Sequence, residues 1–176
     1  MKKVCAAVAA AAMGMCGAVQ AQDFPQGYLG ISYAQPEQDD RFFGSDRFDT
    51  GEVFVRLGGH LNNVFDAELR VGTTLSTKTG NGREFGHDYL ASLMLRAGYD
   101  VGVFHPYVAA GLTYGKEWLE LANGAEVSET FDDVSYAVGT DISLGERLGV
   151  NVEYMQYYDI GNVTMKGPSA GVIWRF

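Results

Sequence analysis

The stretch Tyr89–Tyr99, YLASLMLRAGY, contains the pattern that decides the fold. Its apolar residues at odd positions alternate with a second set of residues, which are Ser92, Met94, Arg96 and Gly98. Apolar side chains that recur with a period of two predict a β-strand with one apolar face. Seven further stretches show the same period, at residues 29–33, 52–57, 66–73, 108–114, 134–143, 150–155 and 169–176. The sequence therefore predicts an all-β fold of eight strands, each of roughly ten residues, the length that a tilted strand needs to cross a bilayer.

The connections between these stretches alternate between short and long. Three are short, at residues 60–64, 100–105 and 145–148, and four are long and polar, at residues 35–49, 76–87, 115–133 and 159–167. Short turns at one end and long loops at the other are typical of outer-membrane barrels. This spacing predicts an antiparallel up-and-down barrel with both termini at the end of the short turns.

The charges indicate which face of each strand points inward. The apolar positions of the alternating stretches carry no charge, whereas the opposite positions form a charged set that we expect in the barrel interior. This set consists of Glu52, Arg56, Asp66, Glu68, Arg70, Arg96, Asp141, Glu153 and Arg175. It contains no Lys, and many of its neighbours are Gly, Ser or Ala, which suits a confined interior with ion pairs. The alternative is a soluble β-sandwich or lipocalin-like barrel, in which this face meets water.

The N-terminus has the pattern of a secretory signal peptide. Lys2 and Lys3 precede an apolar run over residues 4–19, and Val19 and Ala21 occupy the −3 and −1 positions of a cleavage site. We expect residues 1–21 to be removed, which leaves one domain over residues 22–176. Both cysteines of the chain would leave with the signal peptide, so we expect no disulfide.

Composition excludes two further classes of protein. The 176 residues carry a formal charge of −9, which argues against nucleic acid as a partner. After residue 21 no run of 18 apolar residues occurs, so the sequence predicts no transmembrane helix.

The C-terminus, PSAGVIWRF at residues 168–176, carries a family resemblance. A terminal Phe176 preceded by apolar residues at alternate positions (Ala170, Val172 and Trp174) looks like the signal that outer-membrane proteins present to the barrel-assembly machinery. With the signal peptide and the eight alternating stretches, the chain resembles the small outer-membrane β-barrel family, which includes OmpX-like proteins and the membrane domain of OmpA. The resemblance implies a monomer in the outer membrane of a Gram-negative bacterium, in contact with lipid and lipopolysaccharide.

The sequence offers several hypotheses about function. The preferred one is a structural or surface-interaction role, in membrane integrity or adhesion, through the acidic segments 35–49 and 115–133. These segments also suggest binding of divalent cations or of a basic partner, or simply loop solubility. Their aromatic residues suggest either an adhesive tip or packing of the loops onto one another; these residues are Phe42, Phe43, Phe48, Trp118 and Phe131. The alternative function is a narrow gated channel, in which the Arg–Glu pairs of the interior rearrange.

Catalysis is the least favoured hypothesis. His60 and His105 fall at short turns and His87 at the end of a long loop, so no His lies on an expected lipid-facing wall. A lipid A deacylase would need a Ser/His pair on that wall, with an acid nearby. The paired acids and the His87-Asp88 couple supply the residue types of an omptin-like protease, but the strand count and length differ. We expect no enzyme activity, no cofactor and no metal site.

Overall fold

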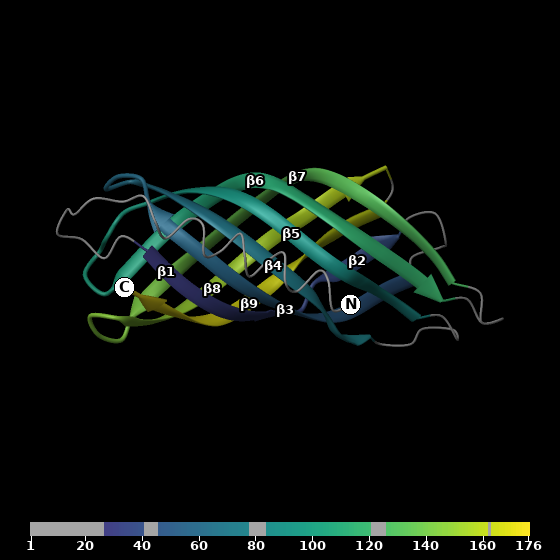
Figure 1. The fold of residues 1–176 in the computed structure, drawn as a ribbon, viewed down its shortest axis with the longest axis horizontal. Helices are drawn as coiled ribbons and strands as arrows, with labels where there is room; N and C mark the ends of the chain where they lie inside the picture. The colour runs from purple at the N-terminus through teal and green to yellow at the C-terminus, as the bar shows by residue number, and fades with distance from the viewer. Residues whose placement is uncertain (1–26, 41–45, 78–83, 121–125, 162) are drawn as a thin grey trace.

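The computed structural model describes residues 27–40, 46–77, 84–120, 126–161 and 163–176, and it shows a closed antiparallel β-barrel (Figure 1). Its strands are β1 (Gly27–Ala34), β2 (Glu37–Asp40), β3 (Asp46–His60), β4 (Phe65–Thr77), β5 (Glu84–Gly98), β6 (Phe104–Glu120), β7 (Glu126–Ser143), β8 (Leu148–Ile160) and β9 (Val163–Arg175). None of the residues in these ranges belongs to a helix long and apolar enough to cross a membrane.

The strands β1 and β2 are two pieces of one barrel strand. Both pair with β3 on one side and with β9 on the other, and they are separated by Gln35 and Pro36. Proline has no N–H to donate to a ladder, so pairing is interrupted there. The barrel therefore has eight strands, as the sequence predicts. It closes where Gly27 and Phe176 exchange backbone hydrogen bonds of 3.3 and 3.0 Å.

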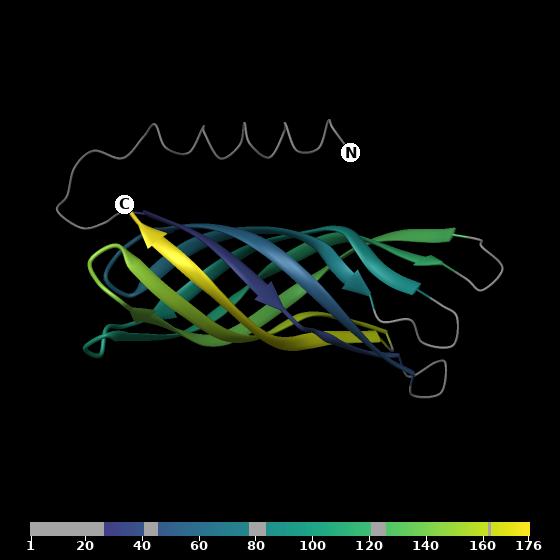
Figure 2. The same ribbon diagram turned by 90° about the horizontal axis from the view of Figure 1, so that it is seen from below.

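The two ends of the barrel differ. Three turns, at residues 61–64, 99–103 and 144–147, lie at the same end as Gly27 and Phe176 (Figures 1 and 2). We call this the inner end and the opposite one the outer end, because short turns face the periplasm in this class of barrel.

The strands are longer than the sequence predicts. From β3 to β9 they have 13 to 18 residues instead of roughly ten, and the extra residues lie mainly at the outer end. Much of each segment expected as a long loop is in fact strand: β2 and the start of β3 lie within 35–49, and β6 and β7 extend into 115–133. The alternating apolar pattern ends at the membrane boundary, whereas hydrogen-bonded pairing continues beyond it, which explains the difference.

Side chains alternate between the two faces as the period of two requires. Large apolar side chains such as Leu93, Leu112 and Val138 are exposed on the outside, where lipid would cover them. Tyrosines lie toward the outer ends of the strands, among them Tyr33, Tyr114, Tyr136 and Tyr154, and Trp174 lies near the inner end. Aromatic residues at both boundaries of an apolar belt are typical of membrane barrels. The interior, by contrast, is packed with polar and apolar side chains.

Candidate functional site

The centre of the barrel contains a network of buried charges with Glu68 at its hub. The Arg56 guanidinium donates to both oxygens of Glu68, with Nε–Oε1 and Nη2–Oε2 distances of 3.1 and 2.9 Å. Arg96 Nη1 donates to Glu68 Oε2 at 3.0 Å, and Arg70 Nε also donates to Glu68. One carboxylate thus accepts hydrogen bonds from three guanidinium groups on three strands. All four side chains are at most 4% exposed.

Two further acids balance the three arginines. Arg70 forms a two-point ion pair with Glu153, with Nη1–Oε1 and Nη2–Oε2 distances of 2.5 and 2.8 Å. Arg96 Nη2 lies 2.6 Å from Asp141 Oδ2. The Asn151 amide group donates to the other Asp141 oxygen at 2.6 Å, and its carbonyl oxygen accepts from Arg56. Three guanidinium groups therefore face three carboxylates, which is the balance that buried charges require.

Two inward tyrosines complete this network. Tyr107 Oη donates to Glu153 at 2.7 Å, and the Arg96 guanidinium carbon lies 3.7 Å from the centre of the Tyr107 ring. Tyr28 donates to Glu68 and accepts from Arg96 at 2.6 Å. Glycines make room for both rings. A Cβ atom on Gly58 would lie 2.1 Å from the Tyr28 ring, and a Cβ atom on Gly139 would lie 2.7 Å from the Tyr107 hydroxyl. We call these residues the central network: Tyr28, Arg56, Glu68, Arg70, Arg96, Tyr107, Asp141, Asn151 and Glu153.

An apolar layer covers the central network on its outer side. It consists of Phe54, Leu90, Met94, Met155 and Tyr157, each at most 2% exposed. The rings of Phe54 and Tyr157 stack with centroids 5.6 Å apart. The sequence predicts a polar inward face and does not indicate this apolar layer. With ion pairs below and packed apolar side chains above, the middle of the lumen is filled, as the small diameter of an eight-stranded barrel allows.

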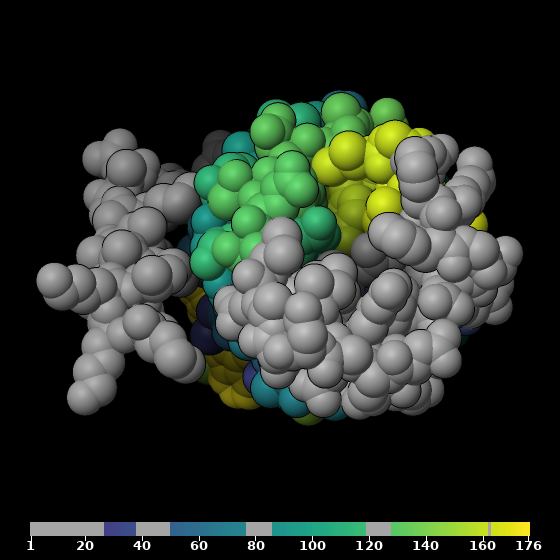
Figure 3. Space-filling view, turned by 90° about the vertical axis from the view of Figure 1, so that its right-hand side faces the viewer, coloured from purple at the N-terminus to yellow at the C-terminus, as the bar shows by residue number. Residues whose placement is uncertain are grey.

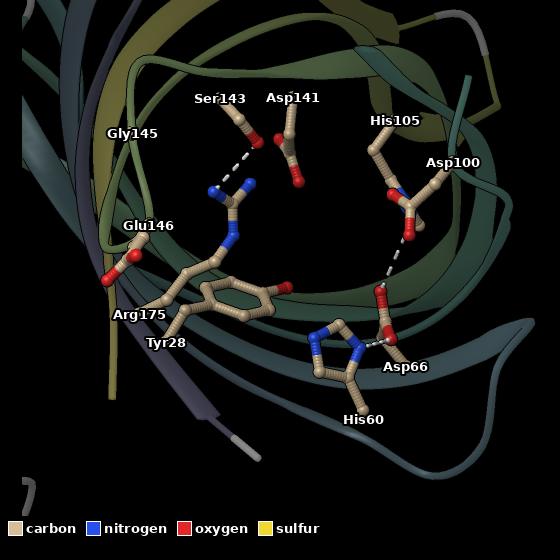
Figure 4. A pocket seen from close by; sticks show the side chains of 10 residues that line it. All are labelled: Tyr28, His60, Asp66, Asp100, His105, Asp141, Ser143, Gly145, Glu146 and Arg175. Carbon is tan, nitrogen blue, oxygen red and sulfur yellow. Dashed lines mark hydrogen bonds and ion pairs between the residues drawn. The ribbon is translucent and has the colours of Figure 1, made fainter. Parts of the chain in front are cut away.

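A polar cavity of about 220 Å³ opens at the inner end, below the network (Figure 4). On one side His60 Nδ1 lies 2.5 Å from Asp66 Oδ1, and His105 Nδ1 lies 2.8 Å from Asp100 Oδ1. On the other side the Arg175 guanidinium donates to Ser143 Oγ at 3.1 Å. These side chains line the mouth, while Asp141 joins it to the central network.

A second buried group of side chains lies at the outer end, around His87. Its Nδ1 lies 2.9 Å from Glu52 Oε1, its Nε2 lies 3.4 Å from Tyr158 Oη, and both the His87 and Glu52 side chains are fully buried. Thr74 Oγ1 donates to the same Glu52 oxygen at 2.9 Å and accepts from the His87 backbone N–H at 2.7 Å. The other oxygen of Glu52, Oε2, is buried without a hydrogen-bond partner in the described structure.

Irregular pairing brings these residues together. The β5–β6 register shifts between His87 and Tyr89, which leaves Asp88 as a bulge, and the β8–β9 register shifts between Gln156 and Tyr158, which leaves Tyr157 as a bulge. A third shift lies beside Glu52, in the β3–β4 pairing. A bulge moves the following or preceding side chain to the other face of the sheet. His87 and Tyr158 therefore both point inward, although their strands would otherwise direct them outward.

Glu117 lies beside His87 in the β5–β6 ladder, beyond Tyr114 and so outside the apolar belt. Partial burial raises the pKa of Glu117; His87 lowers it, and the neighbouring Glu129 raises it further. A second carboxyl group, therefore, is close to the imidazole.

The nine interior charges expected from the sequence fall into three places. Six of them meet in the central network: Arg56, Glu68, Arg70, Arg96, Asp141 and Glu153. Asp66 and Arg175 lie instead at the inner mouth, and Glu52 lies at the outer end with His87. Eight of the nine residues are buried and Arg175 is half-buried.

Several residues of the interior are absent from that expected set. Tyr28, Tyr107 and Asn151 occupy inward positions that a strict period of two assigns to the interior, so parity alone would have found them. The prediction that His87 lies at the end of a loop is wrong, because this residue lies in β5 and is buried. No sequence signal marks the bulge that puts it there. Phe131, expected either at an adhesive tip or in packing between loops, packs on Tyr158, with ring centroids 4.4 Å apart.

The expected assembly signal lies on β9. Val172, Trp174 and Phe176 are 47, 49 and 58% exposed and lie on the outer face together with Ala170. Phe42 and Phe43 are outside the described residues, and so is the expected signal peptide. Within the described ranges, no group of three or more His, Cys, Asp or Glu side chains is arranged to hold a metal ion.

The fold and this filled interior define a small transmembrane β-barrel. Residues 6–176 match the family model described as "Outer membrane protein beta-barrel domain". The chain belongs to this family and is an outer-membrane β-barrel protein. A search of curated proteins finds no significant match to the sequence.

Solved structures share the fold at low sequence identity. Ail, the attachment invasion locus protein of Yersinia pestis, solved in complex with the heparin analogue sucrose octasulfate, is 14% identical, with a TM-score of 0.65 over 86% of this chain and 98% of that one. Neisserial surface protein A (NspA) is 16% identical, with a TM-score of 0.67 over 85% of this chain and 97% of that one. The N-terminal β-barrel domain of Pseudomonas aeruginosa OprF is 15% identical, with a TM-score of 0.59 over 86% of this chain and all of that domain.

Proposed function

We propose that this protein is exported to the outer membrane and acts in surface interaction, without enzyme activity, through the extended strands of its outer end. The observation that carries this proposal is an unpaired strand edge. The β7–β8 ladder begins only at the pair Tyr136–Gln156, so residues 126–135 of β7 pair with β6 alone among the described strands. An open edge is a template on which an extended segment of another protein can add as a strand.

The outer part of β5 also lacks a backbone ladder on its side away from β6. The β4–β5 ladder ends at the pair Gly72–Leu90, so residues 84–89 of β5 pair with β6 alone in the described structure. The outer parts of β5, β6 and β7 thus form a three-stranded sheet, which we call the projecting sheet. Neither of its edges has a backbone ladder to a further described strand, although Thr73 and Thr74 bond the backbone of His87 and Asp88 at the β5 edge. Figure 2 shows these teal and green strands diverging from the yellow and blue ones at the outer end. Figure 3 looks onto the outer end and shows the green atoms of β7 at the edge of the barrel.

The charge of this sheet favours a basic partner. Glu129 and Asp132 are exposed on β7, and Asp88 is exposed on β5, where Lys116 Nζ lies 2.8 Å from its carboxylate. A sulfated ligand such as the one bound to Ail would be repelled by these acids. We therefore assign to this chain an extended, basic polypeptide segment as the class of partner. The apolar belt contacts lipid and lipopolysaccharide, the β9 signal addresses the assembly machinery, and the barrel acts as a monomer.

A peptide pair tests this proposal. The refolded barrel in lipid vesicles is titrated with a ten-residue peptide of alternating Lys and Thr, and with a matched peptide in which prolines replace every second Thr. The charge is equal, but proline has no N–H to donate to a backbone ladder. We expect the first peptide to bind several-fold more tightly, and Glu129→Lys with Asp132→Lys to remove the difference. The control Glu146→Lys, at an inner turn, leaves it in place. Equal binding of both peptides would contradict strand addition.

The second candidate function is a narrow gated channel. The central network favours it, because the paired arginines and acids offer alternative partners to one another. Arg56 Nη2, for example, lies 4.0 Å from Glu153 as well as 2.9 Å from Glu68. Single-channel recording distinguishes the two functions, since a surface-interaction barrel gives no discrete openings in planar bilayers.

A further inference from the structure

The outer end of the barrel is held together by side chains at the two places where its ladders stop. Between β7 and β8, Asp133 Oδ2 accepts from the Asp159 N–H at 2.6 Å and Ser135 Oγ donates to the Tyr157 carbonyl at 2.7 Å. Between β4 and β5, Thr74 takes the corresponding role with His87. The projecting sheet is therefore joined to the other strands by side-chain contacts rather than by continuous backbone pairing.

The group around His87 is the buried part of this junction. His87 belongs to the projecting sheet, whereas Glu52 and Tyr158, which it contacts, belong to β3 and β8 on the other side. Phe131 of the projecting sheet packs on Tyr158 as well, with ring centroids 4.4 Å apart. Two bulges direct His87 and Tyr158 to this point, and bulges commonly mark functional positions.

Several ionisable side chains meet at this junction. Among the described residues with a known contact to His87, the titratable groups are Glu52 from β3, Glu117 from β6 and Tyr158 from β8, while β4 and β7 contribute Thr74 and Phe131. With a neutral imidazole, an ionised Glu52 would be a buried carboxylate whose Oε2 has no hydrogen-bond partner in the described structure. With a protonated imidazole, an ion pair joins the two sides. Burying an unbalanced charge is costly, so closing the junction favours uptake of a proton.

We propose that Glu52, His87, Glu117 and Tyr158 form a proton-dependent clip that holds the projecting sheet against the other strands and so controls access to the open edge of β7. This inference rests on the proposed function for its biological consequence, but the clip itself does not. Imidazole is the side chain that ordinarily changes charge between pH 5 and 8. The closed form binds more protons than the open form, so acid closes the clip and neutral or alkaline pH opens it.

Spin labels across the junction test the clip. Ser128→Cys on β7 and Ile160→Cys on β8 are labelled in a full chain whose Cys5 and Cys16 are replaced by serine, and the distance is measured in lipid vesicles from pH 5 to pH 8. We expect a longer-distance population to grow as pH rises, by at most about tenfold per pH unit for one linked proton. A matched pair on the same strands, Val138→Cys and Tyr154→Cys, lies in the continuous ladder and keeps its distance throughout.

Two variants identify the proton's site. His87→Gln keeps a hydrogen-bonding side chain but does not titrate, so we expect its distances not to change with pH. Glu146→Gln, at an exposed inner turn outside the clip, is the control and should preserve the pH dependence. The clip would be overturned if the distance between the labels at positions 128 and 160 did not change with pH in the parent protein, while the control pair at 138 and 154 kept its distance. It would also be overturned if His87→Gln showed the same pH response as the parent. The peptide titration, repeated at each pH, separates the two proposals. A spin-label distance that changes with pH, without peptide binding, would contradict only the proposed function. A distance that does not change with pH, with peptide binding, would contradict only the clip.

Discussion

The middle and the outer end of this barrel solve the problem of a polar interior in different ways. In the middle, continuous ladders surround a network in which three arginines and three acids balance one another, with Glu68 at the hub. At the outer end, two ladders stop, bulges interrupt the period of two, and the buried His87–Glu52 pair leaves one carboxylate oxygen without a hydrogen-bond partner in the described structure. The comparison shows a rigid, charge-balanced centre beside an outer end whose closure depends on a few side chains.

Removal of the hub is expected to have the largest effect. Glu68→Ala leaves Arg56, Arg70 and Arg96 without their shared carboxylate, and breaking a buried ion pair typically costs about 3–5 kcal/mol. Urea unfolding of the refolded barrel in lipid vesicles measures this loss of stability. Glu146→Ala, at an exposed turn, is the control and should stay within about 0.5 kcal/mol of the parent. A small loss for Glu68→Ala would show that the network is not a unit.

The two layers of the lumen should be separable by conductance. Arg70→Ala removes ion pairs from the central network but leaves the Phe54–Tyr157 layer above it, so we expect the lumen to stay closed. Phe54→Ala should likewise remain closed, because the ion pairs persist beneath the new cavity. The double variant Arg70→Ala with Phe54→Ala weakens both layers. Of the three variants, we expect only this one to show discrete openings in planar bilayers. Openings in Arg70→Ala would instead support the gated channel.

The smallest expected effect is that of Glu117→Gln, at the outer end, on the stability of the barrel. Burial raises the pKa of Glu117 above the ordinary 4.5, so the folded protein disfavours its ionised form. This penalty is absent below pH 4.5 and grows as the pH rises through the raised pKa. Glu117→Gln should therefore unfold at a slightly higher urea concentration than the parent at pH 8, and at the same concentration near pH 4. An equal shift at both pH values would point to packing rather than charge.

The middle and the outer end also differ in how well the sequence predicts which side chains point inward. In the middle, the period of two assigns Arg56, Glu68 and Arg96 to the interior, because regular pairing leaves side-chain direction no freedom. It would also have assigned Tyr28 and Tyr107, whose apolar rings were not expected in a charged lumen. At the outer end the period fails at Asp88 and Tyr157, since a bulge depends on pairing between strands and leaves no mark in either strand alone. The length of the strands was underestimated for the same reason.

Hydrogen exchange along β7 tests this difference between the two regions most directly. We expect the backbone amides from Tyr136 to Ser143 to be protected without interruption, because β7 pairs there with both β6 and β8. From Glu126 to Val134, every second amide should exchange rapidly, since those directed away from β6 have no ladder partner in the described structure. Uninterrupted protection from Glu126 to Ser143 would contradict the account, because it would mean that β7 is fully paired and offers no edge at the outer end.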